Sequence, residues 1–189
     1  MTKFKFILSF LLGLFIFDIE AQEINFNVEQ STVAWTGTKI GGQHQGFIKL
    51  KNASLEIENN QIISGQMTID MNSISCTDLT NDTYNKKLVS HLKSDDFFGV
   101  KDYPEASFKI TDASEFNNTE ASVKGEITIK GKTEILTFTV KKNENEYKAK
   151  IEIDRSKFNV RYGSTSFFES LGDKAIDDIF TLDINLKPK

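Results

Sequence analysis

The chain has 189 residues, with 23 Lys and Arg against 27 Asp and Glu, so its formal net charge is −4. This mild acidic excess argues against a nucleic-acid-binding protein and against a basic surface that docks on membranes. Cys76 is the only cysteine, which excludes an internal disulfide, and an apolar core must therefore supply the stability.

The first 21 residues have the pattern of a cleavable export signal. Lys3 and Lys5 precede an apolar run over residues 6–17, which is shorter than the roughly 20 residues that cross a bilayer. Ala21 is small and polar residues follow it, so we expect cleavage after Ala21 and a mature chain of residues 22–189. The expected location is the periplasm or the exterior, and no later apolar run predicts stable membrane insertion.

Most of the remaining chain alternates apolar and polar residues over short stretches. This period is typical of strands with one buried face, and it is clear in residues 63–71, 147–153 and 182–186. Polar turn sequences separate the runs, as at residues 58–60 and 143–145. We therefore predict an all-β domain with an antiparallel sheet, either closed as a barrel or folded as a sandwich.

Two segments favour short helices that would suit lids at the ends of a barrel. A weak helical pattern covers residues 166–171 and ends at Gly172. A clearer pattern covers residues 77–92, with Thr77 or Asp78 as the N-terminal capping residue. The residues that recur there at helical spacing are Tyr84, Leu88, His91 and Leu92.

Four stretches, taken together in their order and spacing, resemble the YceI-like family of exported lipid-binding proteins. The resemblance implies an eight-stranded antiparallel barrel similar to lipocalins over residues 22–189, with a long apolar channel for polyisoprenoid-type lipids. The lipocalin signature itself is missing, because no Gly stands two residues before Trp35. The stretches are WTGTK at 35–39 with GQHQG at 42–46; HLKSDDFF at 91–98 with YPEASF at 103–108; GEITIKGKT at 125–133; and Asp154-Arg155 followed by residues 158–163.

Three predicted strands carry a small residue between larger apolar ones at positions expected to point inward. If these gaps align across a barrel, they leave an apolar tunnel, because an eight-stranded barrel is at the size where it either fills with side chains or holds one slender ligand. Glycine in a barrel strand can instead permit the bend that closes the sheet, so the small residues are also explained without a tunnel. The triplets are Ile63, Gly65 and Met67; Val123, Gly125 and Ile127; and Tyr147, Ala149 and Ile151.

The aromatic residues point to an apolar ligand. The sequence has 16 Phe against four Tyr and one Trp. Because Phe has no polar atom, a Phe lining suits an alkyl or isoprenoid chain, although Phe is also a common core residue. The expected lining is Phe47, Phe108, Phe138 and Phe158, with Phe97, Phe98, Phe167 and Phe168 near the mouths. The rest of the expected ligand-binding set is Trp35, Gly65, Met67, Gly125, Ala149, Arg155 and Tyr162.

Three basic residues are candidates to hold an anionic head group at a tunnel mouth. They are Arg155, Arg161 and Lys39, since guanidinium groups in particular bind phosphate well. Arg155 directly follows Asp154, and for this residue the sequence favours a structural ion pair or hydrogen bonds with a neighbouring loop.

The sequence shows no set of residues or motif that is typical of an enzyme active site. His44 and His91 are the only histidines, and no HExxH, GxSxG, CxxC or Gly-rich phosphate loop occurs. We therefore predict a non-enzymatic protein without cofactor or metal that carries or stores an isoprenoid or similar long apolar lipid. The alternatives are a fatty-acid or quinone binder in an envelope stress response, a filled β-sandwich, and an outer-membrane barrel with a structural role. The sequence leaves open whether the protein forms a homodimer.

Overall fold

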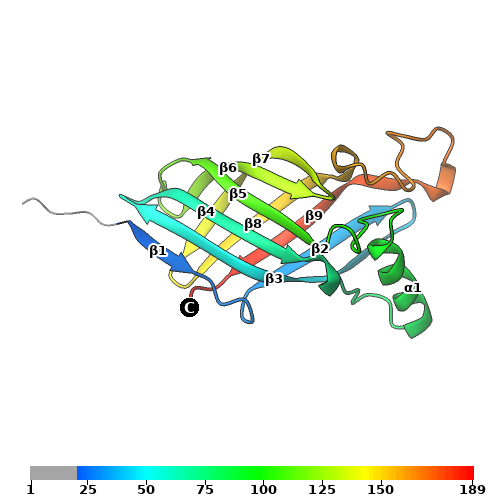
Figure 1. Ribbon diagram of the computed structural model, residues 1–189, viewed down its shortest axis with the longest axis horizontal. Coiled ribbons are helices and arrows are strands. Elements are labelled where there is room, and N and C mark those ends of the chain that lie inside the picture. The colour runs from blue at the N-terminus through cyan, green and yellow to red at the C-terminus, as the bar shows by residue number, and fades with distance from the viewer. Residues whose placement is uncertain (1–20) are drawn as a thin grey trace, which may run out of the picture.

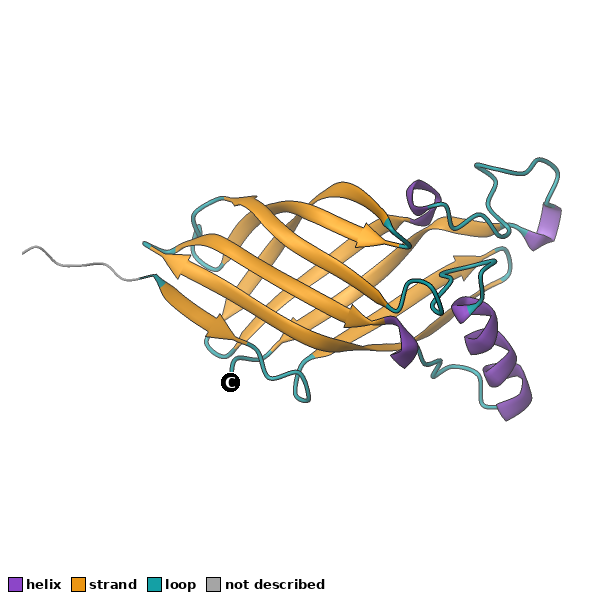
Figure 2. Cartoon of the chain, viewed as in Figure 1, coloured by secondary structure: helices purple, strands orange, loops and turns teal. Residues whose placement is uncertain are grey.

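The computed structural model describes residues 21–189, which form one nine-stranded antiparallel sheet that closes on itself (Figure 1, Figure 2). Strands β2 to β9 make the closed eight-stranded barrel, and β1 is added beside β3. The predicted barrel is confirmed, whereas the predicted signal peptide lies outside the described residues except for Ala21. The strands are β1 (Gln22–Asn25), β2 (Thr32–Lys39), β3 (Gly42–Glu58), β4 (Gln61–Asp70), β5 (Glu105–Ala113), β6 (Glu120–Ile129), β7 (Lys132–Asn143), β8 (Glu146–Asp154) and β9 (Ile176–Leu186).

The long strand β3 closes the barrel because both of its edges have partners. Residues 42–48 pair with β2, and residues 54–57 pair with β1 on the same edge. The opposite edge pairs with β4 over residues 49–58. As a result, β3 joins β2 to β4 and so closes the ring of strands.

Burial alternates along the barrel strands as the sequence pattern predicts. In β6, Val123 and Gly125 are buried while Lys124 and Glu126 between and beside them are exposed. Apolar residues therefore gather inside the barrel and charged residues cover it.

One strand departs from the predicted register. A bulge at Ile63 interrupts the pairing of β4 with β3, between the pairs Glu56–Ser64 and Ile57–Ile62. Ile62 is buried and Ile63 is 46% exposed. The prediction that Ile63 points inward with Gly65 is therefore wrong, because an extra residue in one strand reverses the facing of the residues beyond it.

The contact between β7 and β8 is the least complete in the barrel. These strands pair only from Lys141 with Lys148 to Asn143 with Glu146, near the turn that joins them. Residues 132–140 of β7 and 149–154 of β8 pair only with their other neighbours, β6 and β9. The inward residues of β7 are accordingly half-buried, in contrast to the fully buried ones of β6.

The first predicted helix is confirmed, but it begins later than expected. It is α1 (Asp82–Lys93), and its cap is Asn81, whose side chain accepts hydrogen bonds from the Thr83 and Tyr84 N–H groups at 3.0 and 3.2 Å. The predicted cap Thr77 instead donates its N–H to the Gln45 carbonyl of β3. The chain before α1 thus runs along the barrel, and α1 lies beside one end of it (Figure 1). Tyr84 is 64% exposed, so this member of the helical repeat points away from the barrel.

The second predicted helix does not form. Phe167 and Phe168 both donate N–H groups to the Ser164 carbonyl, which makes one turn, but residues 166–171 continue as turns and bends. Ser170 and Gly172 have φ values of 60° and 52°, in the left-handed region that ends a helix. The remaining short elements are the 3-10 segments η1 (Met71–Ser73), η2 (Arg155–Phe158) and η3 (Gly172–Lys174). Within residues 21–189, no helix is long and apolar enough to cross a membrane.

Candidate functional site

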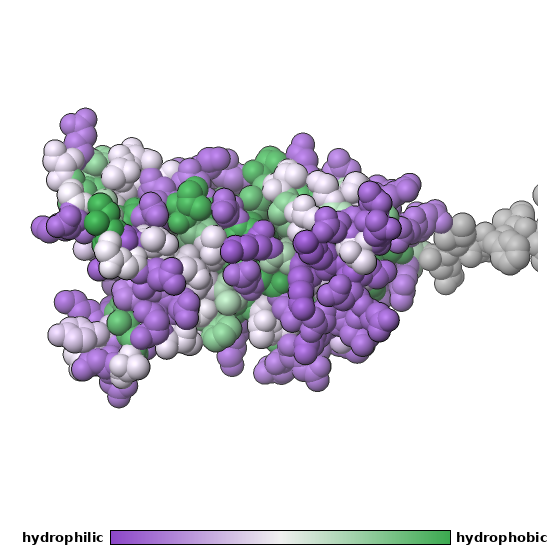
Figure 3. Space-filling model, turned by 180° about the vertical axis from the view of Figure 1, so that it is seen from behind, coloured by the Kyte–Doolittle hydropathy of each residue, from purple (hydrophilic) through white to green (hydrophobic). Residues whose placement is uncertain are grey.

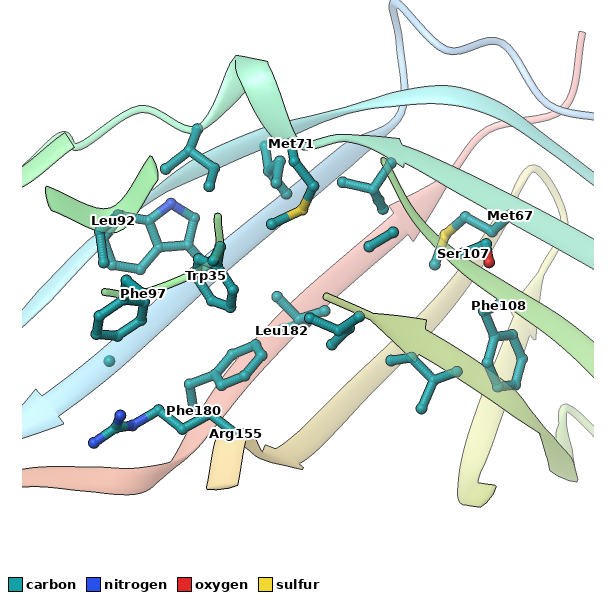
Figure 4. Close-up of a pocket in the computed structure, with 18 of the residues that line it drawn as sticks. Trp35, Met67, Met71, Leu92, Phe97, Ser107, Phe108, Arg155, Phe180 and Leu182 are labelled. Carbon is teal, nitrogen blue, oxygen red and sulfur yellow. The ribbon is translucent and has the colours of Figure 1, made fainter. Parts of the chain in front are cut away.

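The first cavity lies inside the barrel, in the half beside α1, and we call it the near cavity. Its volume is about 120 Å³, and most of its lining side chains are apolar. Figure 4 shows Leu92 and Phe97 toward one end of this cavity and Met67 and Phe108 toward the other. The lining consists of Trp35, Gly37, Ile48, Met67, Ile69, Met71, Ile74, Leu92, Phe97, Phe98, Ala106, Ser107, Phe108, Ile127, Ile129, Arg155, Ile176, Asp177, Phe180 and Leu182.

Strand alternation and one loop position these side chains. Ile127 and Ile129 on β6, like Phe180 and Leu182 on β9, are two residues apart and therefore share the inner face. Phe97 comes from the loop after α1 and is buried, with its ring edge-on to Phe98 at 5.0 Å between centroids. The loop therefore adds an aromatic cover to the strands at the α1 end.

Trp35 is fixed by a contact between the barrel and the chain that leads to α1. Its Nε1 donates a hydrogen bond to the Ser75 carbonyl at 3.0 Å. Trp35 pairs across the sheet with Gly46, where an added Cβ would lie 1.8 Å from the same carbonyl oxygen. Glycine at position 46 thus lets this segment approach the strand closely, and the indole is oriented toward the near cavity.

The same segment is held by the Asp78 carboxylate. Asp78 accepts hydrogen bonds from the Gln45 N–H at 2.9 Å and from the His44 ring at 2.7 Å, and Cys76 donates to it at 3.3 Å. Burial raises the pKa of Asp78, but these hydrogen bonds outweigh it and lower the pKa to about 2. Asp78, predicted as a helix cap, instead ties the α1 end to β3.

A second, smaller cavity lies in the half of the barrel away from α1, and we call it the far cavity. Its volume is about 60 Å³. Phe26 and Tyr147 close its end: both are buried, and their rings meet edge-on at 5.5 Å. The lining consists of Phe26, Ser54, Leu55, Gln66, Met67, Phe108, Ile110, Val123, Phe138, Val140, Tyr147, Lys148, Ala149, Ile184 and Leu186.

A third pocket, lined by charged, aromatic and aliphatic residues, lies outside the barrel on the loops of the α1 end, and we call it the outer pocket. Its volume is about 500 Å³. Tyr162 and Phe168 line it and are each about half exposed, at 49% and 48%. Arg161 and Lys174 supply positive charge, and Asp95 lies opposite in the loop after α1. Of the predicted head-group candidates, Arg161 is the one in this pocket.

Arg155 lies in the wall of the near cavity but has a structural environment. Its guanidinium donates to the main-chain carbonyls of Val160, Tyr162, Ile176 and Asp177 at 2.8–2.9 Å. The same group lies 3.3 Å from the Asp178 carboxylate and is 2% exposed. Four hydrogen bonds to carbonyls and the ion pair with Asp178 hold this group, so Arg155 joins the η2 loop to β9 and serves the scaffold and not a head group.

Five of the predicted ligand-binding residues line none of these three spaces. Phe47 is on the outer face of β3 and is 48% exposed, because Ile48 takes the inward position. Phe158 is buried in η2, and Phe167 stacks under Arg161, whose Cζ atom is 4.6 Å from the ring centroid. Gly65 and Gly125 point inward, but neighbouring side chains fill the space above them.

The two glycines show why small residues did not produce a tunnel at their own positions. A Cβ at Gly65 would lie 2.5 Å from Leu55 Cδ2 and 2.8 Å from Ile110 Cδ1. A Cβ at Gly125 would lie 2.4 Å from Phe108 Cζ. Each glycine therefore makes room for a larger neighbour, so these positions do not serve as gaps in a tunnel wall.

The other predicted residues lie in or beside the cavities, and several lining residues were missed. Ala149 and Phe138 face the far cavity; Trp35, Phe97 and Phe98 face the near cavity. The prediction favoured Phe and missed the aliphatic lining, although alternation along the strands marks most of it. The missed aliphatic and methionine residues of the near cavity are Ile48, Ile69, Met71, Ile74, Leu92, Ile127, Ile129, Ile176 and Leu182.

In the part of the chain that the structure describes, no group of three or more His, Cys, Asp or Glu side chains is placed to hold a metal ion. The fold and the cavities place the protein among small antiparallel barrels with an apolar, partly hollow interior.

The sequence model of the YceI-like domain matches residues 17–187. The chain therefore belongs to the YceI-like domain family, as the resemblance in the sequence predicts. A UPF0312 protein of Staphylococcus epidermidis is 31% identical over 129 residues, which make up 68% of this chain and 65% of that relative. This chain thus spans slightly less than two thirds of the relative's length.

Solved structures share the fold. Burkholderia cenocepacia BcnA is 26% identical with a TM-score of 0.67, over 85% of this chain and 98% of that one. A polyisoprenoid binding domain from Saccharophagus degradans is 12% identical with a TM-score of 0.56, over 90% and 99% of the two chains. The Campylobacter jejuni YCEI protein is 16% identical with a TM-score of 0.56, over 99% of each chain. At such low identity the last two show likeness of fold alone.

Proposed function

We propose that this protein is an exported, non-enzymatic carrier or reservoir that encloses a long apolar lipid, with an isoprenoid chain as the favoured ligand. The observation that carries the proposal is the near cavity, whose lining is apolar except at Ser107, Arg155 and Asp177. Arg155 is already bonded to protein carbonyls. The cavity therefore offers a ligand mainly apolar contacts and few hydrogen bonds. Membership of the YceI-like family and the fold shared with a polyisoprenoid binding domain support the choice of isoprenoid.

The energetics favour a carrier or reservoir over a trap. Burying an apolar chain from water is worth about 0.8 kcal/mol per methylene. A chain that comes from a bilayer is already in an apolar medium, so the net gain is close to zero. Transfer is then decided by shape, by contacts to the head group and by the relative amounts of membrane and protein.

The exterior argues against the alternative of an outer-membrane barrel. Such barrels carry an apolar band on their outer face. The outward positions of β6 are instead polar or charged, and they include Ser122, Lys124 and Glu126. Figure 3 shows hydrophilic residues over much of the face opposite to that of Figure 1, with smaller hydrophobic areas between them.

The other structural alternative, a filled β-sandwich, is wrong because the strands form one closed sheet. Fatty-acid and quinone ligands remain within the same proposal, since their chains match the same apolar lining. Identification of the bound lipid separates these ligands.

The test of binding is the lipid that accompanies the protein. Protein purified without detergent is analysed by native mass spectrometry, and its lipids are extracted and identified. An apolar lipid in a fixed ratio to protein is expected, and the same masses report whether the protein is a monomer or a homodimer.

Ala106→Phe, which fills the near cavity, should lose the lipid. Lys109→Phe adds the same ring to an exposed position of β5 and should retain it. Equal occupancy in the two variants would count against the proposal.

Export and the proposed domain limits have their own test. The full chain is expressed in a Gram-negative host, and the fractions after osmotic shock are compared. We expect a soluble product whose N-terminus is near Gln22, so that residues 22–189 form the mature domain. Full-length protein retained in the cytoplasm would overturn the export proposal and leave the binding proposal standing.

A further inference from the structure

We propose that Phe108, together with Met67, forms a movable partition across the barrel that sets the length of chain the protein holds. The inference rests on the proposed function and deepens it. Short apolar chains occupy the near cavity alone, and a long isoprenoid reaches the far cavity only by displacing the Phe108 ring.

The two cavities meet at these residues. Met67 and Phe108 are the only residues that line both the near and the far cavity within the described chain. They lie opposite each other on the paired strands β4 and β5. A chain that extends from the α1 end toward Phe26 and Tyr147 must therefore pass between or beside their side chains.

The position of the Phe108 ring has a clear local cause. The ring leans from β5 across Gly125 on β6, whose missing Cβ leaves the space that the ring occupies. Beyond Gly125 it meets the Phe138 ring of β7, with 5.3 Å between centroids and 52° between planes. Because β5, β6 and β7 are adjacent, Phe108 and Phe138 bridge three neighbouring strands of the wall.

The surroundings of the ring permit it to move. Phe108 is buried, but cavities border its ring on two sides, so moving the ring requires less repacking than moving a Phe that is packed on every side. Its neighbour Met67 is unbranched and adapts to changes of shape. Phe138 is only half-buried, beside the part of β7 that does not pair with β8. Ala149 lines the far cavity as well, and its small side chain leaves width there for a chain.

The volumes make the partition relevant to ligand length. With Phe108 in its position over Gly125, the near cavity has a volume of about 120 Å³ and the far cavity a volume of about 60 Å³. Ten residues of β6 at roughly 3.3 Å each, tilted by about 40°, give an interior about 25 Å long. The near cavity takes up only part of that length, so the ring divides short ligands from long ones.

The experiment compares chain-length profiles. All-trans prenols with two, three, four and nine isoprene units are delivered from cyclodextrin, and binding is followed by the emission of Trp35. Trp35 is the only tryptophan and lines the near cavity, so it reports on ligands of every length. In Phe108→Ala we expect the affinity for the four-unit and nine-unit prenols to rise at least about tenfold, because each newly buried methylene is worth about fourfold. The affinity for the two-unit prenol should change by less than about threefold.

The matched control is Phe180→Ala, the same truncation at a residue that lines only the near cavity. It should weaken binding of all lengths by a similar factor. If thermal unfolding shows that Phe108→Ala does not fold, Phe108→Leu takes its place, with a gain of about threefold for the long prenols.

The experiment separates failure of the proposed binding function from failure of the proposed partition. If no prenol changes the Trp35 emission of the natural protein, the proposed function fails and the partition fails with it. If prenols bind but the folded Phe108 variant keeps the natural length profile, the partition is overturned and the binding function stands.

Discussion

The near and far halves of the barrel interior are built by the same strands, yet they are closed in different ways. At the far end, Phe26 is 1% exposed and its N–H donates to the Ala53 carbonyl, so a buried ring on a paired backbone seals the barrel. At the near end, α1 buries none of its residues, and the loops combine the buried Phe97 with half-exposed aromatics such as Phe168.

The two closures indicate which end of the barrel opens more easily. Alternation along the strands makes both halves apolar, but only segments outside the barrel decide which end is sealed. An end covered by a helix without buried residues opens at lower free-energy cost than one sealed by a buried aromatic pair. A ligand is therefore expected to enter beside α1.

The largest expected effect concerns the anchor of the near end. Arg155→Met should lower the free energy of unfolding by about 3–5 kcal/mol, because it leaves buried carbonyls and the Asp178 carboxylate without their partner. Urea denaturation measures the change. Arg161→Met, at an exposed position on the same loop, is the control and should change stability by less than about 0.5 kcal/mol. Similar small effects for both variants would show that Arg155 is not the anchor.

The second prediction compares the two ends with one kind of truncation. Phe26→Ala should cost about 3–5 kcal/mol, because it opens a void at a fully buried position. Phe180→Ala, at a half-buried position that already borders the near cavity, should cost about 1–2 kcal/mol. Thermal and urea unfolding of both variants test the order. Equal losses would contradict the view that the far end is the tightly packed one.

The third prediction uses pH to loosen the near end. The pKa of Asp78 is about 2 in the folded protein against 3.8 for the free side chain, so its charged form stabilises the fold above pH 4. Because solvent screens this partly exposed carboxylate, we expect a contribution of about 1 kcal/mol. Because the folded pKa is lowered, this contribution is lost as the pH falls from about 4 to about 2. Asp78→Asn should be less stable at pH 7 and should lack this part of the acid dependence. Asp112→Asn, an exposed carboxylate on β5, should keep it.

The smallest expected effect concerns the wall between the two ends. Amides in residues 132–140 of β7 that face β8 should exchange hydrogen faster than those that face β6, because only β6 supplies ladder partners there. Hydrogen exchange followed by NMR resolves the alternate residues. Uniform protection along β7 would indicate that the strands pair in solution.

The sequence predicted the strands and one of the two expected helices, because both kinds of element depend on local periodicity. The inward facing of Tyr147, Ala149 and Ile151 follows from alternation and agrees with their burial in the structure. The failures arose where distant segments interfere with the period. The bulge in β4 turned Ile63 outward, and contacts of Thr77 and Asp78 with Gln45 delayed the start of α1.

The predicted ligand-binding residues show the same contrast between local pattern and distant contacts. Their apolar character was readable from the sequence, but whether a residue borders a cavity depends on how its neighbours fill the space. Gly125 and Phe108 show this dependence: the glycine was taken as a gap, and the ring of Phe108 occupies it.

Strand alternation and turn residues act over a few neighbouring positions, so they were enough to predict an antiparallel sheet with one apolar face. They left a barrel and a sandwich both open, and the resemblance to the YceI-like family favoured the closed barrel that the structure has. Three features became visible in the folded protein alone: the interior has two cavities that meet at Met67 and Phe108, Phe26 seals one end, and Arg155 serves the scaffold. These features depend on side chains from strands far apart in the sequence that compete for one volume, and no local pattern records the outcome of that competition.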